Sequence, residues 1–225
     1  MAVSFRQGIL ALLVFGISFG FIEAAIVVYL RALTAPYREA AGLAKNELFP
    51  VLTPRKVHVP EEVIQIWKAE RLREAATLTL LWSAGMAMGR TGTARFAVFL
   101  VAFGLWDIFF YAGLRLLINW PDSLMTPDLL FLLPVPWWGP VLAPLLAASV
   151  MVAGGSLYLW RPFRVRAWHW AGILAGSAVM IAAFCWDAQL LLDGEVPRVF
   201  VWPIYLAGLG MTLASTAAAW RTGRT

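Results

Sequence analysis

Charged residues are scarce in this chain. Only 14% of its 225 residues are Asp, Glu, Lys or Arg, against roughly 25% in soluble domains, and 61% are hydrophobic. Several apolar runs reach about 18 residues or more, the length at which a helix can cross a bilayer. The shortage of charge therefore argues against a soluble domain. It predicts an integral membrane protein whose first partner is the lipid bilayer.

Cysteine and histidine are also nearly missing. The single Cys185 excludes an intrachain disulfide and a cysteine-based metal site, while His58 lies in a loop and His169 at the edge of a span. This argues against histidine-ligated iron, copper or zinc, and carboxylates alone would suit only hard cations. No lysine lies in an apolar run, which argues against a retinal Schiff base. We predict no metal and no cofactor, and the net charge of +5 needs no nucleic-acid partner.

The apolar runs predict an all-α, polytopic bundle of six transmembrane helices in one domain. Short alternating segments, typical of a membrane barrel, are absent. The first run is longer than a signal-peptide core and is expected to stay as an anchor. The second helix is charged over its first half and, at ~1.5 Å per residue, roughly 43 Å long, so it should project beyond the bilayer. The predicted spans are 8–30, 61–89, 96–118, 140–160, 168–192 and 200–220.

A proline-rich stretch separates the third and fourth spans. Residues 121–140 have an apolar interior but too many prolines for a regular span. We predict an extracytoplasmic interfacial or re-entrant segment packed on the bundle, where irregular backbone is tolerated. Within it, Asp128 either caps a short helix over 129–133 or reaches into a polar site.

Arginine is distributed unevenly around the spans. One side of the predicted membrane carries eight arginines and no acid, and the other carries a long polar loop and nearly all the acids. The positive-inside rule therefore predicts that both termini are cytoplasmic, in a cell membrane of the bacterial inner-membrane type. The arginines on the inner side are Arg6, Arg90, Arg95, Arg161, Arg164, Arg166, Arg221 and Arg224.

Three predicted spans carry one acid each in their outer half, namely Glu23, Asp107 and Asp187. A charge at bilayer depth costs roughly 2.5–3.5 kcal/mol on insertion scales, so such residues mark a polar site or a structural ion pair. On a helix, Tyr111 and Arg115 follow Asp107 at i+4 and i+8 and form a stripe with it.

The second helix adds acids on one face, since Glu70, Glu74 and Thr77 are spaced i, i+4, i+7. They either line a funnel that opens outward or form a solvated helix end held by local ion pairs. Trp106 and Trp186 either cover the carboxylates or pack in the core. The full set of candidate substrate- or ion-binding residues is Glu23, Arg31, Glu70, Glu74, Asp107, Tyr111, Arg115, Asp128 and Asp187.

The first and third spans share a pattern that favours an internal duplication. Phe19-Gly20-x-x-Glu23 with Leu30-Arg31 matches Phe103-Gly104-x-x-Asp107 with Leu114-Arg115. Chance is the alternative, because the match does not extend into the even-numbered spans.

Three functions compete at this stage. The acids and arginines favour an ion-coupled transporter of a small solute. They also suit a membrane-embedded enzyme for a lipid or isoprenoid, in which buried carboxyl groups act as general acids. Alternatively, the chain is an accessory subunit of a membrane complex or a homo-oligomer, with structural charges. The sequence does not decide whether the protein is an enzyme and assigns no catalytic residue.

Overall fold

We analysed a computed structural model of the chain, which describes residues 5–40, 61–193, 195, 197 and 199–223. The described chain is predominantly helical. Four of its helical stretches are long and apolar enough to cross a membrane: Gln7–Tyr37, Gly92–Ile118, Leu142–Trp160 and Ala167–Leu192. These are the features of a membrane protein, as the composition predicts.

Seven helices and one β-hairpin make up the described part of the chain. The segments predicted to span at 61–89 and 200–220 are helical, as α2 and α7, but they are not among the four apolar stretches. The first half of α2 is charged, and α7 contains Gly, Ser and Thr among its apolar residues. The elements are α1 Phe5–Ala40, α2 Glu61–Met88, α3 Gly92–Ile118, β1 Pro127–Phe131, β2 Trp137–Pro140, α4 Leu142–Trp160, α5 Ala167–Phe184, α6 Ala188–Leu192 and α7 Trp202–Thr222.

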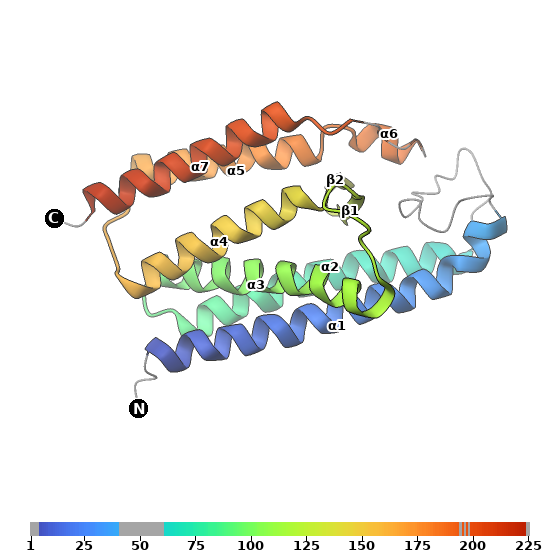
Figure 1. Ribbon diagram of the computed structural model, residues 1–225, viewed down its shortest axis with the longest axis horizontal. Helices are drawn as coiled ribbons and strands as arrows, with labels where there is room; N and C mark the ends of the chain where they lie inside the picture. The colour runs from blue at the N-terminus through green and yellow to red at the C-terminus, as the bar shows by residue number, and fades with distance from the viewer. Residues whose placement is uncertain (1–4, 41–60, 194, 196, 198, 224–225) are drawn as a thin grey trace.

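The helices form two groups joined by α4 (Figure 1). In one group α3 packs against α1, α2 and α4, and in the other α5 packs along α7. The groups meet through α4, which contacts α7, and through β2, which contacts α4 and α5. The buried hydroxyl of Tyr205 on α7 donates a 2.6 Å hydrogen bond to the carbonyl of Ala143 on α4. The space between the two groups is where the site lies.

Two glycines allow close approach in the first group. A Cβ on Gly20 would lie 2.7 Å from the Trp106 carbonyl oxygen, so α1 contacts the α3 backbone directly. A Cβ on Gly104 would lie 2.5 Å from the Ala148 carbonyl oxygen, so α3 contacts α4 in the same way. Both glycines belong to the pattern shared by the first and third spans. In each case the glycine allows its helix to contact the backbone of a neighbouring helix.

Helix α1 is longer than predicted. It continues through Arg31 and Pro36 to Ala40, ten residues past the expected end of the first span at Leu30. Residues 31–33 are good helix formers, and a proline removes only one intrahelical hydrogen bond. The rest of the predicted polar loop, residues 41–60 with His58, lies outside the described residues.

The proline-rich stretch forms an antiparallel hairpin, so the alternative of a short helix over 129–133 capped by Asp128 is wrong. Asp128 pairs with Gly139 and Leu129 with Trp138 across the two strands. The prolines lie at strand ends, Pro127 opening β1 and Pro140 closing β2, where the missing N–H is tolerated. Strand β2 of the hairpin contacts both α4 and α5.

The predicted span 168–192 is interrupted. Helix α5 ends at Phe184, a turn follows over Cys185–Asp187, and the short α6 continues from Ala188. Asp187 therefore lies in a break between helices rather than within a regular one.

Candidate functional site

A cavity of about 490 Å³ lies between the two helix groups. This volume falls within the roughly 300–1,000 Å³ of pockets that bind small organic molecules. Residues of α1, α2, α3, α4, α5, α7 and the hairpin line it. Its charged lining residues all belong to the end beside the hairpin and are Glu23, Arg31, Glu70, Arg73, Glu74, Asp107 and Asp128.

Asp107, Tyr111 and Asp128 form what we term the acid cluster. Asp107 and Tyr111 lie one helical turn apart on α3, as their i, i+4 spacing predicts, and both are buried. The Tyr111 hydroxyl donates a 2.9 Å hydrogen bond to Oδ2 of Asp128 on β1. Asp128 is thus a contributor to the site, which was one of the two alternatives drawn from the sequence.

Asp107 is the member without a hydrogen-bond donor. Its side chain is only 9% exposed and lines the cavity, and Asp128 lies within electrostatic range. Among the described residues no group donates a hydrogen bond to it. A buried carboxyl group without donors is costly in its charged form.

Asp128 lies in the hairpin and titrates in an unusual range. Burial raises its pKa to about 6, although the hydrogen bond from Tyr111 and the positive charge of Arg31 act in the opposite direction. Arg31 lies with its guanidinium carbon 4.2 Å from the ring centre of Trp120, so its cation is held against an aromatic face at the same end of the cavity.

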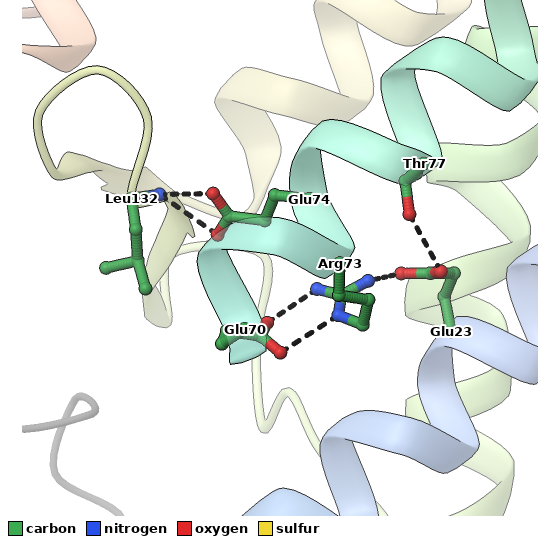
Figure 2. A network of polar contacts seen from close by, with 6 residues as sticks. All are labelled: Glu23, Glu70, Arg73, Glu74, Thr77 and Leu132. Carbon is green, nitrogen blue, oxygen red and sulfur yellow. Dashed lines mark hydrogen bonds and ion pairs between the residues drawn. The ribbon is translucent and has the colours of Figure 1, made fainter. Parts of the chain in front are cut away.

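Glu23 belongs to a separate network, shown in Figure 2, that joins α1 to α2. Its Oε2 forms an ion pair with Nη1 of Arg73, and its Oε1 accepts a 3.0 Å hydrogen bond from Thr77. Arg73 also holds Glu70 through two bonds, at 2.9 Å from Nε and 2.5 Å from Nη2. Glu23 is 3% exposed, so this network compensates a buried charge.

Glu74 fixes the hairpin to α2. Both of its carboxylate oxygens accept from the backbone N–H of Leu132, at 3.0 and 2.9 Å, as Figure 2 shows. Leu132 directly follows β1, so one side chain of α2 positions the strand that carries Asp128. Glu74 lines the cavity as well, but its carboxylate is bonded to the turn that follows β1.

Two of the predicted site residues lie elsewhere. Asp187, in the break after α5, does not line the cavity. Arg115 is exposed, and its Nη1 donates 2.9 Å hydrogen bonds to the carbonyls of Asn119 and Pro121, so it closes the end of α3. Trp106 is buried in the cavity wall, whereas Trp186 is 61% exposed.

Sequence reasoning missed Arg73 as a site residue and missed the aromatic wall. Arg73 is spaced i, i+3 from Glu70, which is a local signal, but its pairing with Glu23 depends on how α1 meets α2. The wall is a connected set of rings next to the acid cluster, with centres 5.2–6.5 Å apart, formed by Phe103, Trp106, Phe131 and Trp137.

Comparison with known proteins adds no assignment. No protein family, no curated protein and no solved structure matches the chain. In the described ranges, no group of three or more His, Cys, Asp or Glu side chains is placed to hold a metal ion. The fold and the site together define a helical membrane protein with buried carboxyl groups at one end of an aromatic cavity.

Proposed function

We propose that this chain is a membrane-embedded enzyme that transfers protons to and from a lipid or isoprenoid substrate. The observation that carries the proposal is Asp107, a buried carboxyl group without a donor among the described residues, in the wall of an aromatic cavity. Burial disfavours the charged form of a carboxyl group, so such a group keeps a proton that it can donate to a substrate inside the pocket.

The chemistry needs no cofactor. Protonated Asp107 gives its proton to one carbon of a substrate double bond, so that a C–H bond forms as the π bond breaks. The positive charge on the neighbouring carbon is stabilised by the faces of Phe103, Trp106 and Phe131. Loss of a proton from an adjacent carbon back to the Asp107 carboxylate restores a double bond. The net reaction is an isomerisation or, when a second double bond attacks the cation, a cyclisation.

Tyr111 and Asp128 support the acid in this scheme. The hydrogen bond from Tyr111 to Asp128 places a second carboxyl group within electrostatic range of Asp107. Two neighbouring carboxyl groups disfavour double ionisation. Arg31 adds a positive charge at the same end, which suits an anionic or polar head group.

We further propose the finer topology of the protein. Both termini are cytoplasmic, α2 and α7 complete a set of six spans, and the acid cluster lies in the outer half of a bacterial-type inner membrane. The arginines of the loops after α2 and α4 and at the two ends of the chain support this orientation, because they share one side and no acid accompanies them.

The experiment compares lipid extracts of cells that lack the protein with extracts of cells complemented by wild type, Asp107→Asn or Asp122→Asn. Asp122 is an exposed acid and serves as the matched control. We expect wild type and Asp122→Asn to restore one altered lipid or isoprenoid species. Asp107→Asn should lose that activity by about 10²–10⁴-fold, the usual contribution of a general acid. Identical extracts from all four strains would refute the enzyme proposal.

An ion-coupled carrier is the second candidate. One observation favours it: the cavity lining on α3 runs from Thr93 to Leu114, close to both ends of the helix. Proteoliposomes that trap a pH-sensitive dye distinguish the two functions. Proton flux that requires Asp107, without any change in lipid species, would select the carrier.

A further inference from the structure

Beyond the acid cluster, the cavity continues as an apolar groove. Its lining on α3 extends from Thr93 to Leu114, 21 residues further along the helix, which at ~1.5 Å per residue is roughly 32 Å. This is close to the ~30 Å thickness of a hydrocarbon core. The charged residues are confined to one end, so the remainder of the groove offers only apolar and neutral side chains to a ligand.

Small residues create the room on the α4 and α7 sides. Ala147, Gly154 and Thr216 line the groove, and a Cβ built on Gly154 would meet only the Thr216 methyl group, at 3.7 Å. Helix α2 lines only the charged end, up to Thr77, whereas α5 lines the groove from Trp170 to Phe184. Helix α2 packs chiefly on α3, and α5 packs chiefly on α7 (Figure 1).

We propose that this groove binds one long hydrocarbon chain, with its polar or unsaturated end at the acid cluster and its tail directed toward the opposite end of α3. The small residues near the far end, Gly154 above all, set the longest chain that fits. This inference rests on the proposed function, because it names the shape of the substrate that Asp107 would act on.

The dimensions and polarity of the groove favour a single chain over the alternatives. A small polar solute would leave most of the apolar wall without a partner, and a two-chain lipid needs a wider space than one helix-to-helix groove. A single acyl or isoprenoid chain instead fits both parts of the groove, because its hydrocarbon tail matches the apolar length and its polar end matches the charged end. Phe96, near the far end of the groove, lies 11 residues from Asp107, which is a distance of roughly 17 Å along α3.

The test uses photoactivatable probes in proteoliposomes. Stearyl alcohol and decyl alcohol, each carrying a diazirine at the last carbon, are cross-linked to the full chain and the labelled peptides are mapped by mass spectrometry. We expect the stearyl probe to label peptides that contain Phe96, Gly154 or Thr216. The decyl probe should label peptides nearer the acid cluster, around Phe103 and Met180.

Substitution of the small residue provides the critical comparison. Gly154→Leu should reduce stearyl labelling at the far end about tenfold, which corresponds to about 1.4 kcal/mol, and leave decyl labelling unchanged. Ala153→Leu is the control, because Ala153 is exposed on the same helix and does not line the groove. If Gly154→Leu does not fold, Ser177→Leu on α5, with Ala178→Leu as control, blocks the groove from the other side.

Two outcomes would overturn the inference. One is equal labelling of the groove and of residues outside it, such as Leu174, which is 59% exposed. The other is an identical response to Gly154→Leu and Ala153→Leu. Labelling of Asp107→Asn separates this inference from the proposed function. If the groove is labelled normally while lipid chemistry does not depend on Asp107, the enzyme proposal fails and the chain-binding groove stands.

Discussion

At the scale of single residues, the buried acids divide into two kinds. Glu23 and Glu74 are each tied to a partner, Arg73 and the Leu132 N–H respectively. Asp107 has no hydrogen-bond donor among the described residues, and Asp128 has one side-chain donor, Tyr111. Glu23 and Glu74 therefore hold neighbouring elements together, whereas Asp107 lines the cavity without such a bond.

Asp128 should make stability depend on pH. Its pKa is about 6 in the folded chain, against an ordinary value of 3.8, so the folded state binds this proton more tightly than the unfolded state. The contribution of Asp128 to the free energy of unfolding is therefore greatest below about pH 4. It decreases as the pH rises to about 6, by up to about 1.4 kcal/mol per pH unit. Asp128→Asn should remove this dependence from thermal unfolding followed by tryptophan fluorescence in detergent.

Asp122→Asn serves as the control for that measurement, because Asp122 is exposed near the hairpin. Its unfolding midpoint should depend on pH as the wild type does. A slope between pH 4 and pH 6 that is the same in Asp128→Asn and wild type would show that Asp128 titrates normally.

Arg73 should be the most sensitive residue of the ion-pair network. Removing one partner of a buried pair costs roughly 3–5 kcal/mol, and we expect Arg73→Gln near the lower end because its side chain is 23% exposed. The double variant Glu23→Gln/Arg73→Gln should recover part of that loss, since Glu23 is then no longer a buried unpaired charge, whereas Glu70 still lacks its cation. Arg71→Gln, at an exposed position, should have little effect on the unfolding midpoint. A double variant as unstable as the single one would contradict this pairing.

Residue patterns predicted part of the site. Depth and spacing singled out Glu23, Asp107 and Tyr111 as candidates, because a helix has a fixed period and charges in apolar runs are rare, and all three line the cavity. The partner of Glu23 could not be predicted, since Arg73 meets it only through the packing of α1 on α2. The sequence predicted that Asp187 lies within a continuous span, because nothing in its apolar surroundings signals the break after Phe184.

At the scale of elements, glycines set the distance between helices. Gly20 lets α1 contact the α3 backbone at the height of Trp106, one turn from Glu23. Gly20→Ala should force the two helices apart and destabilise the protein by about 1–3 kcal/mol, as overpacked cores do. Gly8→Ala is the matched control on the same helix, because a Cβ there has no neighbour within 4 Å among the described residues. Equal unfolding midpoints for the two variants would refute the close contact.

The hairpin shows the limit of element prediction. Its prolines correctly excluded a regular span, but the apolar run between them gave no alternation from which to recognise strands. The pairing of Asp128 with Gly139 and of Leu129 with Trp138 depends on a surface supplied by α4 and α5. Helix positions, by contrast, were predictable from the apolar runs, and α2 begins at Glu61 and ends at Met88, within one residue of expectation.

At the scale of the whole molecule, two helix groups enclose one cavity whose charges lie at a single end. The arrangement combines a largely apolar cavity with a buried carboxyl group, that of Asp107, in its wall. Composition alone predicted the membrane class, but the division into two groups follows from tertiary packing between α3, α4, α5 and α7, which no local pattern encodes.

The central claim, that Asp107 protonates carbon in a lipid or isoprenoid, is tested most directly by deuterium incorporation. Membranes that contain wild-type or Asp107→Asn protein are incubated in heavy water, and the deuterium content of their extracted lipids is measured by mass spectrometry. The account predicts a lipid species that gains carbon-bound deuterium with wild-type protein and none with Asp107→Asn. Absence of such a species with the wild type, or equal incorporation with both proteins, would contradict it.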